Sequence, residues 1–304
     1  MVFALSRWQS IWKDEDNRLR PFWRFCAAVA LAMVLQRAAA GVTASLAWDQ
    51  VSFDAIFRPL WAVSLLGGFS GLLFVLDGIP SRPLTHMGLG FDRAWGRELR
   101  HGILIGSGLI AACVAAIALW GKISFAVEVW PGSEGMLVVT AGQIWIIATA
   151  ALAEESVFRG YPFQRLCDSI GGGGASLVLS LAFGMAHLAN PQSSRSGFIN
   201  TVLIGILFSL VYLRTRSLWI CWGIHFAWNF VLGFVLGLPV SGMTQFAAWI
   251  KGDARGPYWL TGGAYGIEAS FVCTLVCLAA IGLIYFYLPA AEARPEAPQE
   301  PAEN

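Results

Sequence analysis

Two adjacent carboxylates, Glu154 and Glu155, directly follow a predominantly apolar stretch at residues 144–153. A charged side chain within a bilayer span costs about 2.5–3.5 kcal/mol even on scales derived from insertion experiments. Ionisable groups at that depth usually face the protein interior or a hydrated cavity, where they often mark a functional site. This pair is therefore the first candidate for chemistry in the chain.

The two carboxylates cannot play the same part on one helix, because successive helical residues point about 100° apart while residues four apart share a face. Glu155 stands four residues before Arg159, which is the favourable order for an ion pair on a helix. Glu154 has no such local cation, and burial suits a carboxylate of this kind to act as a general base. The alternative is that both side chains lie in solvent beyond the end of the helix.

Two further pairs of side chains are spaced to share a helical face, Phe183 with His187 and His225 with Asn229. A single histidine on an apolar helix is usually a hydrogen-bonded core residue. A His–Asn pair can be an interhelical hydrogen bond worth about 0.6–2 kcal/mol. Taken together with Glu154, however, these residues are the groups needed to activate a water molecule and to bind an oxyanion.

The elements that must position these residues are membrane spans. Of the 304 residues, 57% are hydrophobic and 13% are charged, and the mean hydropathy is +0.62, whereas soluble proteins are about 25% charged. This composition predicts an all-α polytopic membrane protein. The net charge of +1 indicates no surface for nucleic acid. The six cysteines lack the paired spacing of a metal knuckle or a disulfide framework.

Apolar runs of about 20 residues predict transmembrane helices. We expect about eight, at residues 22–48, 55–76, 102–120, 137–157, 175–188, 197–213, 218–238 and 267–288. Most Lys and Arg residues of the connections fall on one side, which predicts that both termini are cytoplasmic. The short loops and the Ala, Gly and Trp content are typical of a bacterial plasma-membrane protein. The sequence does not indicate an oligomeric state.

The two ends of the chain differ from this transmembrane part, which we place at residues 22–289. Residues 1–21 carry basic side chains and tryptophans, so we expect a cytoplasmic interfacial segment. Residues 290–304 are rich in Pro and Glu, and this tail is expected to be disordered. We expect residues 240–250 to lie along the outer surface.

Three motifs, Glu-Glu-x-x-x-Arg, Phe-x-x-x-His and His-x-x-x-Asn, occur in this order on successive predicted spans. The ordered set resembles the CAAX-protease and bacteriocin-processing (CPBP) family of intramembrane proteases, which includes the Ras-converting CAAX endopeptidases and the Abi proteins. The resemblance extends over about residues 137–238. It implies a helical core around a cavity open to the cytoplasm, and an endopeptidase that cuts a peptide or a membrane-associated protein.

The same resemblance implies roles for individual residues. Glu154 and His187 would activate a water molecule, and His225 and Asn229 would stabilise the tetrahedral oxyanion. Glu155 belongs to the same catalytic set and would organise the site together with Arg159, and Phe183 is a further supporting residue.

Members of this family are often described as metalloproteases. A catalytic zinc takes three protein ligands, typically His and carboxylate, plus one open position, and Glu154, His187 and His225 could supply such a set. The sequence contains no His-Glu-x-x-His motif, and hydrolysis driven by a glutamate without metal is equally consistent with it. No cofactor is certain, and the catalytic type stays open at this point.

Two other functions are compatible with buried carboxylates and histidines. One is a proton-coupled transporter with a relay of such groups, although no internal repeat of the kind common in transporters is visible. The other is a catalytically silent scaffold on the same fold.

The depth of the site poses a geometric problem. If the fourth span ends at residue 157, His187 lies more than ~15 Å away from Glu154 along the next span, given a rise of about 1.5 Å per residue. We therefore expect the fourth helix to continue through residues 161–166 despite Pro162, and the glycines at 171–174 to let the chain re-enter. Arg37, midway along the first span, is expected to pair with Glu155 or Glu268, or to line the cavity.

Overall fold

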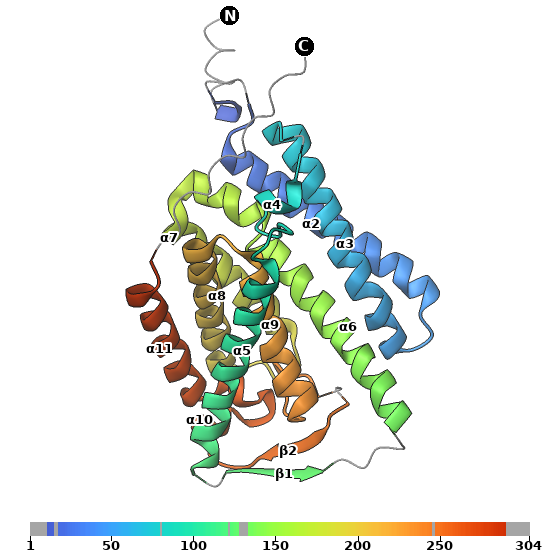
Figure 1. The fold of residues 1–304 in the computed structure, drawn as a ribbon, viewed down its shortest axis with the longest axis vertical. Coiled ribbons are helices and arrows are strands. Elements are labelled where there is room, and N and C mark those ends of the chain that lie inside the picture. The colour runs from blue at the N-terminus through green and yellow to red at the C-terminus, as the bar shows by residue number, and fades with distance from the viewer. Residues whose placement is uncertain are drawn as a thin grey trace, which may run out of the picture.

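The computed structural model describes residues 11–14, 18–79, 81–120, 122–127, 133–244 and 247–289. Its long helices are α2 (Pro21–Leu46), α3 (Gln50–Asp77), α5 (Trp95–Ala118), α6 (Ser133–Phe158), α7 (Tyr161–Ala186), α8 (Arg195–Thr215), α9 (Leu218–Asn229) and α11 (Phe271–Tyr287) (Figure 1). The predicted tail and the first ten residues of the predicted interfacial segment lie outside this described part of the chain.

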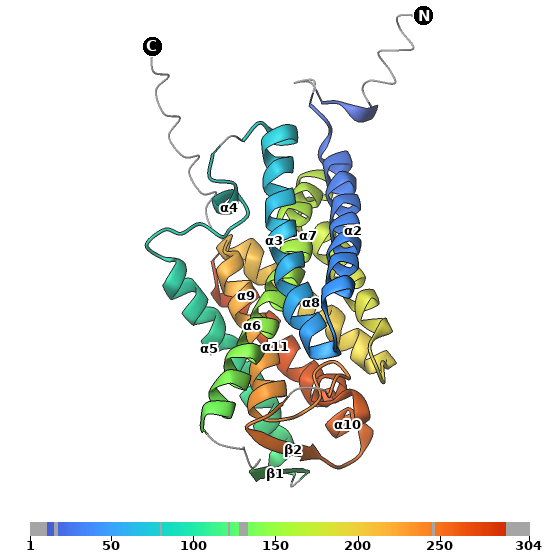
Figure 2. The ribbon, with the colours of Figure 1, turned by 90° about the vertical axis from the view of Figure 1, so that its right-hand side faces the viewer.

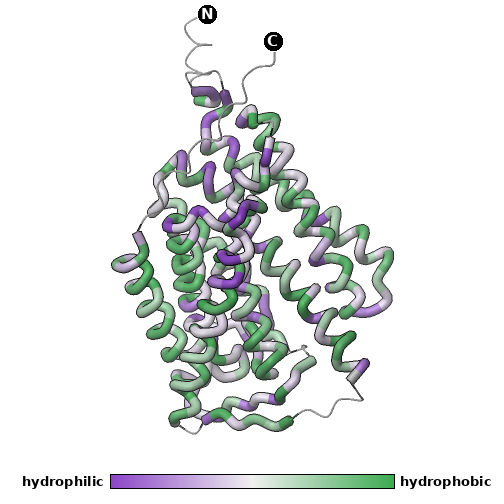
Figure 3. The backbone as a smooth tube through the Cα atoms, viewed as in Figure 1, coloured by the Kyte–Doolittle hydropathy of each residue, from purple (hydrophilic) through white to green (hydrophobic). Residues whose placement is uncertain are grey.

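The predicted all-α membrane fold is confirmed. Six helical stretches in the described residues are long and apolar enough to cross a membrane, and Glu134–Ala189, the longest of them, includes both α6 and α7. The last predicted span is the shorter apolar helix Phe271–Tyr287. The helices are hydrophobic along most of their length, with hydrophilic residues gathered before α2 and at the start of α5 (Figure 3).

Helices α2 and α3 form an antiparallel pair beside the rest of the bundle (Figure 2). Their connection ends in a capping box, in which the Asp49 side chain accepts a hydrogen bond from Ser52 N at 2.6 Å. This bond lowers the pKa of the Asp49 carboxyl. The two helices have a hydrophobic core of their own, which includes Leu65 and Phe69, and Tyr161 from α7 joins it.

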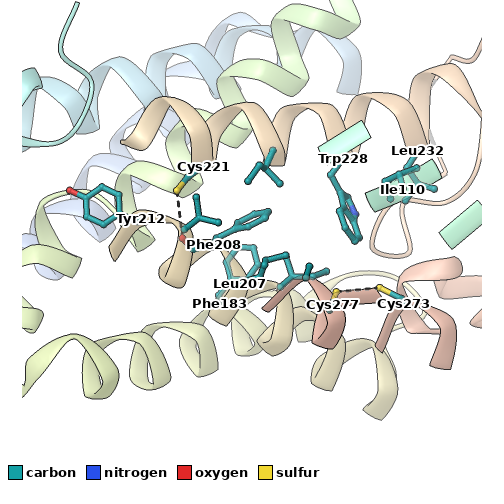
Figure 4. Packing of buried hydrophobic residues seen from close by; sticks show 14 of the residues in the cluster. Ile110, Phe183, Leu207, Phe208, Tyr212, Cys221, Trp228, Leu232, Cys273 and Cys277 are labelled. Carbon is teal, nitrogen blue, oxygen red and sulfur yellow. Dashed lines mark hydrogen bonds between the residues drawn. The ribbon is translucent and has the colours of Figure 1, made fainter. Parts of the chain in front are cut away.

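Close approach of α5 and α9 depends on glycine. At Gly102, Gly106 and Gly223 a Cβ atom would collide with the backbone of the facing helix; at Gly223 it would lie 2.6 Å from Leu99 O. Small residues spaced in this way allow membrane helices to pack backbone to backbone. The larger core forms around this seam, with Cys221 and Trp228 of α9 pointing toward Leu207, Phe208 and Phe183 (Figure 4).

The prediction of a continuous fourth helix is wrong. Helix α6 ends at Phe158, and α7 begins at Tyr161 with Pro162 in its first turn, a position where the missing N–H of proline has no helical partner to lose. The glycine run acts as expected, because Gly171 adopts a left-handed φ of 78° and breaks α7 into two segments. The second segment carries Phe183 and ends immediately before His187.

A short antiparallel ribbon closes one end of the bundle, where β1 (Ile123–Val127) pairs with β2 (Ile250–Ala254) (Figure 1). The short helices α4 (Pro83–His86) and α10 (Tyr258–Thr261) lie in connections. In the segment 240–250, which was predicted to lie along the outer surface, Thr244 is exposed, but Val240 and Gly242 are buried. Val240 pairs with Met243 in a tight turn, and both residues line an internal pocket instead of the surface.

A buried carboxylate at the end of α3 ties three helices together. Asp77 Oδ1 accepts hydrogen bonds from Arg24 of α2 and Arg165 of α7, each at 2.7 Å. Its other oxygen accepts one from the hydroxyl of Tyr161 at 2.7 Å. Removal of one partner from a buried ionic network leaves the other charges uncompensated.

Replacement of Asp77 by Asn should therefore lower the free energy of unfolding by about 3–5 kcal/mol, measured by SDS titration of the purified protein. Asp54→Asn is a matched control on the same helix, since Asp54 interacts only locally, with Arg58 four residues on and with the exposed amide of Gln50 four residues back. It should cost less than about 1 kcal/mol. Equal losses in both variants would contradict the proposed importance of the Asp77 network.

Candidate active site

One pocket collects residues from all three sequence motifs. It has a volume of about 50 Å³, which is room for a few water molecules. Its walls come from α6, α7, α8, α9, the turn at 240–243 and the 3₁₀ turn Ile267–Ala269. The lining residues are Glu154, Phe183, His187, Thr201, Ile204, Phe208, His225, Trp228, Asn229, Val240, Ser241, Met243 and Glu268.

The two adjacent glutamates diverge as the helical geometry predicts. Glu155 is fully buried, and its Oε1 accepts hydrogen bonds from Arg159 Nη1 at 3.2 Å and from His225 Nδ1 at 2.7 Å. The predicted Glu155–Arg159 pair is thus present. The alternative of two glutamates in solvent is wrong, since Glu155 is 0% and Arg159 is 1% exposed.

Aromatic rings and a carbonyl enclose Arg159. Its guanidinium carbon lies 4.8 Å from the ring centre of Phe183 and 5.2 Å from that of Phe208, and Nη2 donates to Gly205 O at 3.0 Å. Desolvated contacts of a guanidinium with aromatic faces are stabilising. Phe183 therefore supports the site by holding the arginine that neutralises Glu155.

Glu154 faces the pocket and keeps a free acceptor. Its side chain is 23% exposed, but Oε2 is buried and has no hydrogen-bond partner among the described residues. His225 Nε2 is 3.8 Å from this oxygen, which is too far for a direct hydrogen bond and leaves room for a bridging water. Helix α6 is held against α9 near this point by Trp222, whose Nε1 donates to Ala148 O at 2.7 Å.

The hydrogen bonds define which histidine nitrogens face the pocket. Phe183 O and the Glu155 carboxylate only accept, so His187 Nδ1 must donate to the first at 2.8 Å and His225 Nδ1 to the second. In both rings this leaves Nε2 as the atom available for chemistry. His187 lies directly after the last residue of α7, and its ring contacts Phe183 with centroids 4.5 Å apart.

Asn229 ends the regular part of α9. From Phe230 to Val235 the chain continues as a π-helical turn, a distortion that often occurs at functional sites. The half-buried Asn229 lies one helical turn after His225 and lines the same pocket. The structure thus brings together Glu154, His187, His225 and Asn229 as the sequence predicted, with Glu155, Arg159 and Phe183 directly behind them.

Glu268 is a third carboxylate in the pocket wall, and sequence reasoning assigned it no place there. It is 5% exposed, and Trp228 Nε1 donates to its Oε1 at 2.9 Å. The only feature of the sequence that pointed to Glu268 was the presence of an acidic residue at the start of an apolar run. The expected pairing of Arg37 with Glu155 or Glu268 is wrong, because Arg37 is exposed and both glutamates have other partners.

The residues present do not form the metal site that the family resemblance raised. Within the described ranges, no three His, Cys, Asp or Glu side chains are placed to hold one metal ion. His225 uses Nδ1 for Glu155, and only its Nε2 remains to face Glu154, 3.8 Å away. A catalytic zinc needs a third protein ligand beside such a pair, and the described residues do not supply one. We therefore derive no step through a metal.

Residues 136–231 match the protein family described as type II CAAX prenyl endopeptidase Rce1-like. The matched region contains all three motifs, from Glu154 to Asn229. No curated protein sequence matches the chain.

The enclosure of Arg159 predicts that its planar head group is essential, since lysine cannot contact Glu155 and Gly205 O together. Arg159→Lys should lower the free energy of unfolding by about 2 kcal/mol, through the lost charged hydrogen bond and the ring contacts. Arg214→Lys is the control, because Arg214 also donates to a carbonyl and contacts a tyrosine ring, but it is only half-buried and its hydrogen bond is exposed to solvent. A loss in Arg159→Lys no larger than in the control would show that the planar head group is not essential.

Proposed function

We propose, from the match of residues 136–231 to the type II CAAX prenyl endopeptidase Rce1-like family, that this protein is an intramembrane protease and that its pocket hydrolyses a peptide bond with a water molecule activated by Glu154. The unpartnered, buried Oε2 of Glu154 carries this proposal. A buried acceptor without a partner is costly, and a water molecule in the adjacent pocket would satisfy it. The carboxylate is then placed to take a proton from that water.

His187 and His225 complete the water site. In the neutral tautomer that its Phe183 bond sets, His187 presents an unprotonated Nε2 and can accept a second hydrogen bond from the water. His225 donates from Nδ1 to Glu155 and has Nε2 3.8 Å from Glu154, and the role proposed for it requires a proton on both ring nitrogens. In that form His225 donates from Nε2 into the pocket.

Asn229 and His225 then serve as the oxyanion donors. The water oxygen attacks the carbonyl carbon while its proton passes to Glu154. The oxyanion accepts hydrogen bonds from the Asn229 amide and from His225 Nε2–H. Breakage of the C–N bond returns the proton from Glu154 to the leaving amine, so the enzyme ends in its starting state.

The substrate that fits this site is a membrane-associated peptide or protein. The pocket lies among apolar helices and holds only a few waters, so a substrate chain must reach it from within or beside the bilayer. The family description points to prenylated CAAX proteins. We further propose that the substrate of this protein is prenylated. We also propose that the protein lies in the plasma membrane with both termini in the cytoplasm.

Removal of the proposed base provides a direct test. Glu154→Gln keeps the shape of the side chain but cannot accept the proton, so cleavage of a membrane-anchored reporter peptide should fall by about 10²–10⁴-fold. Glu134→Gln, at the exposed first turn of the same helix, should leave the rate unchanged. Full activity in the Glu154 variant would refute the proposed mechanism.

Metal dependence can be examined separately. Since no three-ligand set is formed in the described part of the chain, the purified protein should keep its rate after dialysis against a strong chelator. Element analysis of the same sample confirms that metal has been removed. A loss of activity that zinc restores would show that substrate or metal binding rearranges these side chains into a metal site.

A further inference from the structure

Glu268 lies outside the three motifs and beyond residues 136–231, yet it lines the active-site pocket. It sits in the 3₁₀ turn Ile267–Ala269, immediately before α11. Buried carboxylates are rarely retained in a pocket wall unless their oxygens are fully used. The partners of Glu268 therefore indicate what it does.

Every partner of the Glu268 carboxylate in the described structure is a donor. Trp228 Nε1 donates to Oε1 at 2.9 Å. The backbone N–H of Ser241 and its hydroxyl, the latter at 3.2 Å, donate to Oε2. A carboxylate whose two oxygens both accept hydrogen bonds is used as an acceptor. Glu268 is therefore not arranged to deliver a proton to the leaving amine.

The backbone of Glu268 is fixed as firmly as its side chain. Asn200 of α8 donates from Nδ2 to Glu268 O at 2.7 Å and to Ser270 O at 2.9 Å. The Asn200 carbonyl oxygen in turn accepts from Thr274 Oγ1 at 2.7 Å. The Glu268 carboxylate is thus held on a turn whose backbone is itself fixed by hydrogen bonds. The elements that bind to this carboxylate are positioned by it.

The first of these elements is the turn Val240–Met243. Its ends exchange two backbone hydrogen bonds of 3.0 and 2.9 Å, and its central residues, Ser241 and Gly242, have left-handed φ values of 47° and 84°. Serine disfavours this conformation, and the bond from Ser241 N to Glu268 compensates for it. Because Val240, Ser241 and Met243 line the pocket, the Glu268 carboxylate sets one wall.

The second element is the end of α9. Trp228 precedes Asn229, and the regular helix gives way to the π-helical turn at Phe230. At such a transition the helix alone does not fix the direction of the last side chains. The indole bond to Glu268 holds this end of α9, and with it the proposed oxyanion donor Asn229.

We propose that Glu268 is a positioning residue of the active site, which anchors Trp228 and the Val240–Met243 turn so that Asn229 faces Glu154 across the pocket. This inference rests on the proposed peptidase function. It assigns Glu268 no contact with the reacting atoms. A displacement of about 1 Å in such a constellation can reduce a rate by about 10²-fold.

The first test is Glu268→Gln, which keeps the size of the side chain but sets its amide donor against either Trp228 Nε1–H or the Ser241 donors. The expected result is a kcat about 10–100-fold below that of the wild type, with KM within about threefold. The matched control is Glu98→Gln, since Glu98 also accepts from a serine hydroxyl, that of Ser217, but at the far end of α9. A kcat within twofold of the wild type, or a loss that only follows the folded fraction, overturns the proposal.

A double-mutant cycle with Trp228→Phe separates positioning from general destabilisation. If Glu268 acts through Trp228, the double variant should be no more than about threefold slower than the slower single variant. Losses that multiply would show that the two residues act independently, and this would overturn the route through Trp228.

Hydrogen exchange tests the anchor without relying on catalysis. In Glu268→Gln the Ser241 amide should exchange at least about tenfold faster than in the wild type, while the amides of α5 stay unchanged. An unchanged Ser241 rate overturns the proposal. If the wild type cleaves no peptide, the proposed function fails, but this exchange experiment still decides whether Glu268 anchors the turn.

Discussion

A charged side chain that is buried must have a partner of opposite charge or a hydrogen-bond partner next to it. This requirement determines how the helices pack at the centre of the molecule. Glu155 has no exposed surface and is shared by Arg159 and His225, while Arg159 is enclosed by Phe183 and Phe208. In a bilayer such a cluster is stable only if every member keeps its partner. Four helices must therefore meet at one point, and the active-site pocket forms beside that point.

The rest of the fold can be understood as the means of holding this meeting point. The glycine seam lets α9 lie directly against α5. The helix that carries His225 and Asn229 is therefore supported by close packing against a second helix. The break at Gly171 divides α7 into two segments, and the second leads to His187, which lines the same pocket as Glu154. The Asp77 network fixes the first segment of α7 to α2 and α3. These features lie away from the reacting groups, and together they position the helices that carry the active-site residues.

Local periodicity was enough to predict part of this arrangement. The four-residue spacing of Glu155 and Arg159 predicted their ion pair, and the apolar runs predicted an all-α membrane fold. The end of α6, the turn at Val240–Met243 and the place of Glu268 could not be predicted in the same way, because they depend on contacts between residues far apart in the chain. The Gly102–Gly106 spacing is a signal that sequence reasoning could have used for the α5–α9 seam, whereas nothing local marks Glu268 as part of the pocket wall.

The central claim is that Glu154 holds a water molecule within reach of both histidines, and its most direct test is an experimental structure of the protein in lipid at a resolution that reveals ordered waters. We expect a water within about 3.2 Å of Glu154 Oε2 that also contacts Nε2 of His187 or His225, as hydrogen-bond geometry requires. A Glu154 carboxylate that bonds directly to another side chain, with no water between it and the histidines, would contradict the claim.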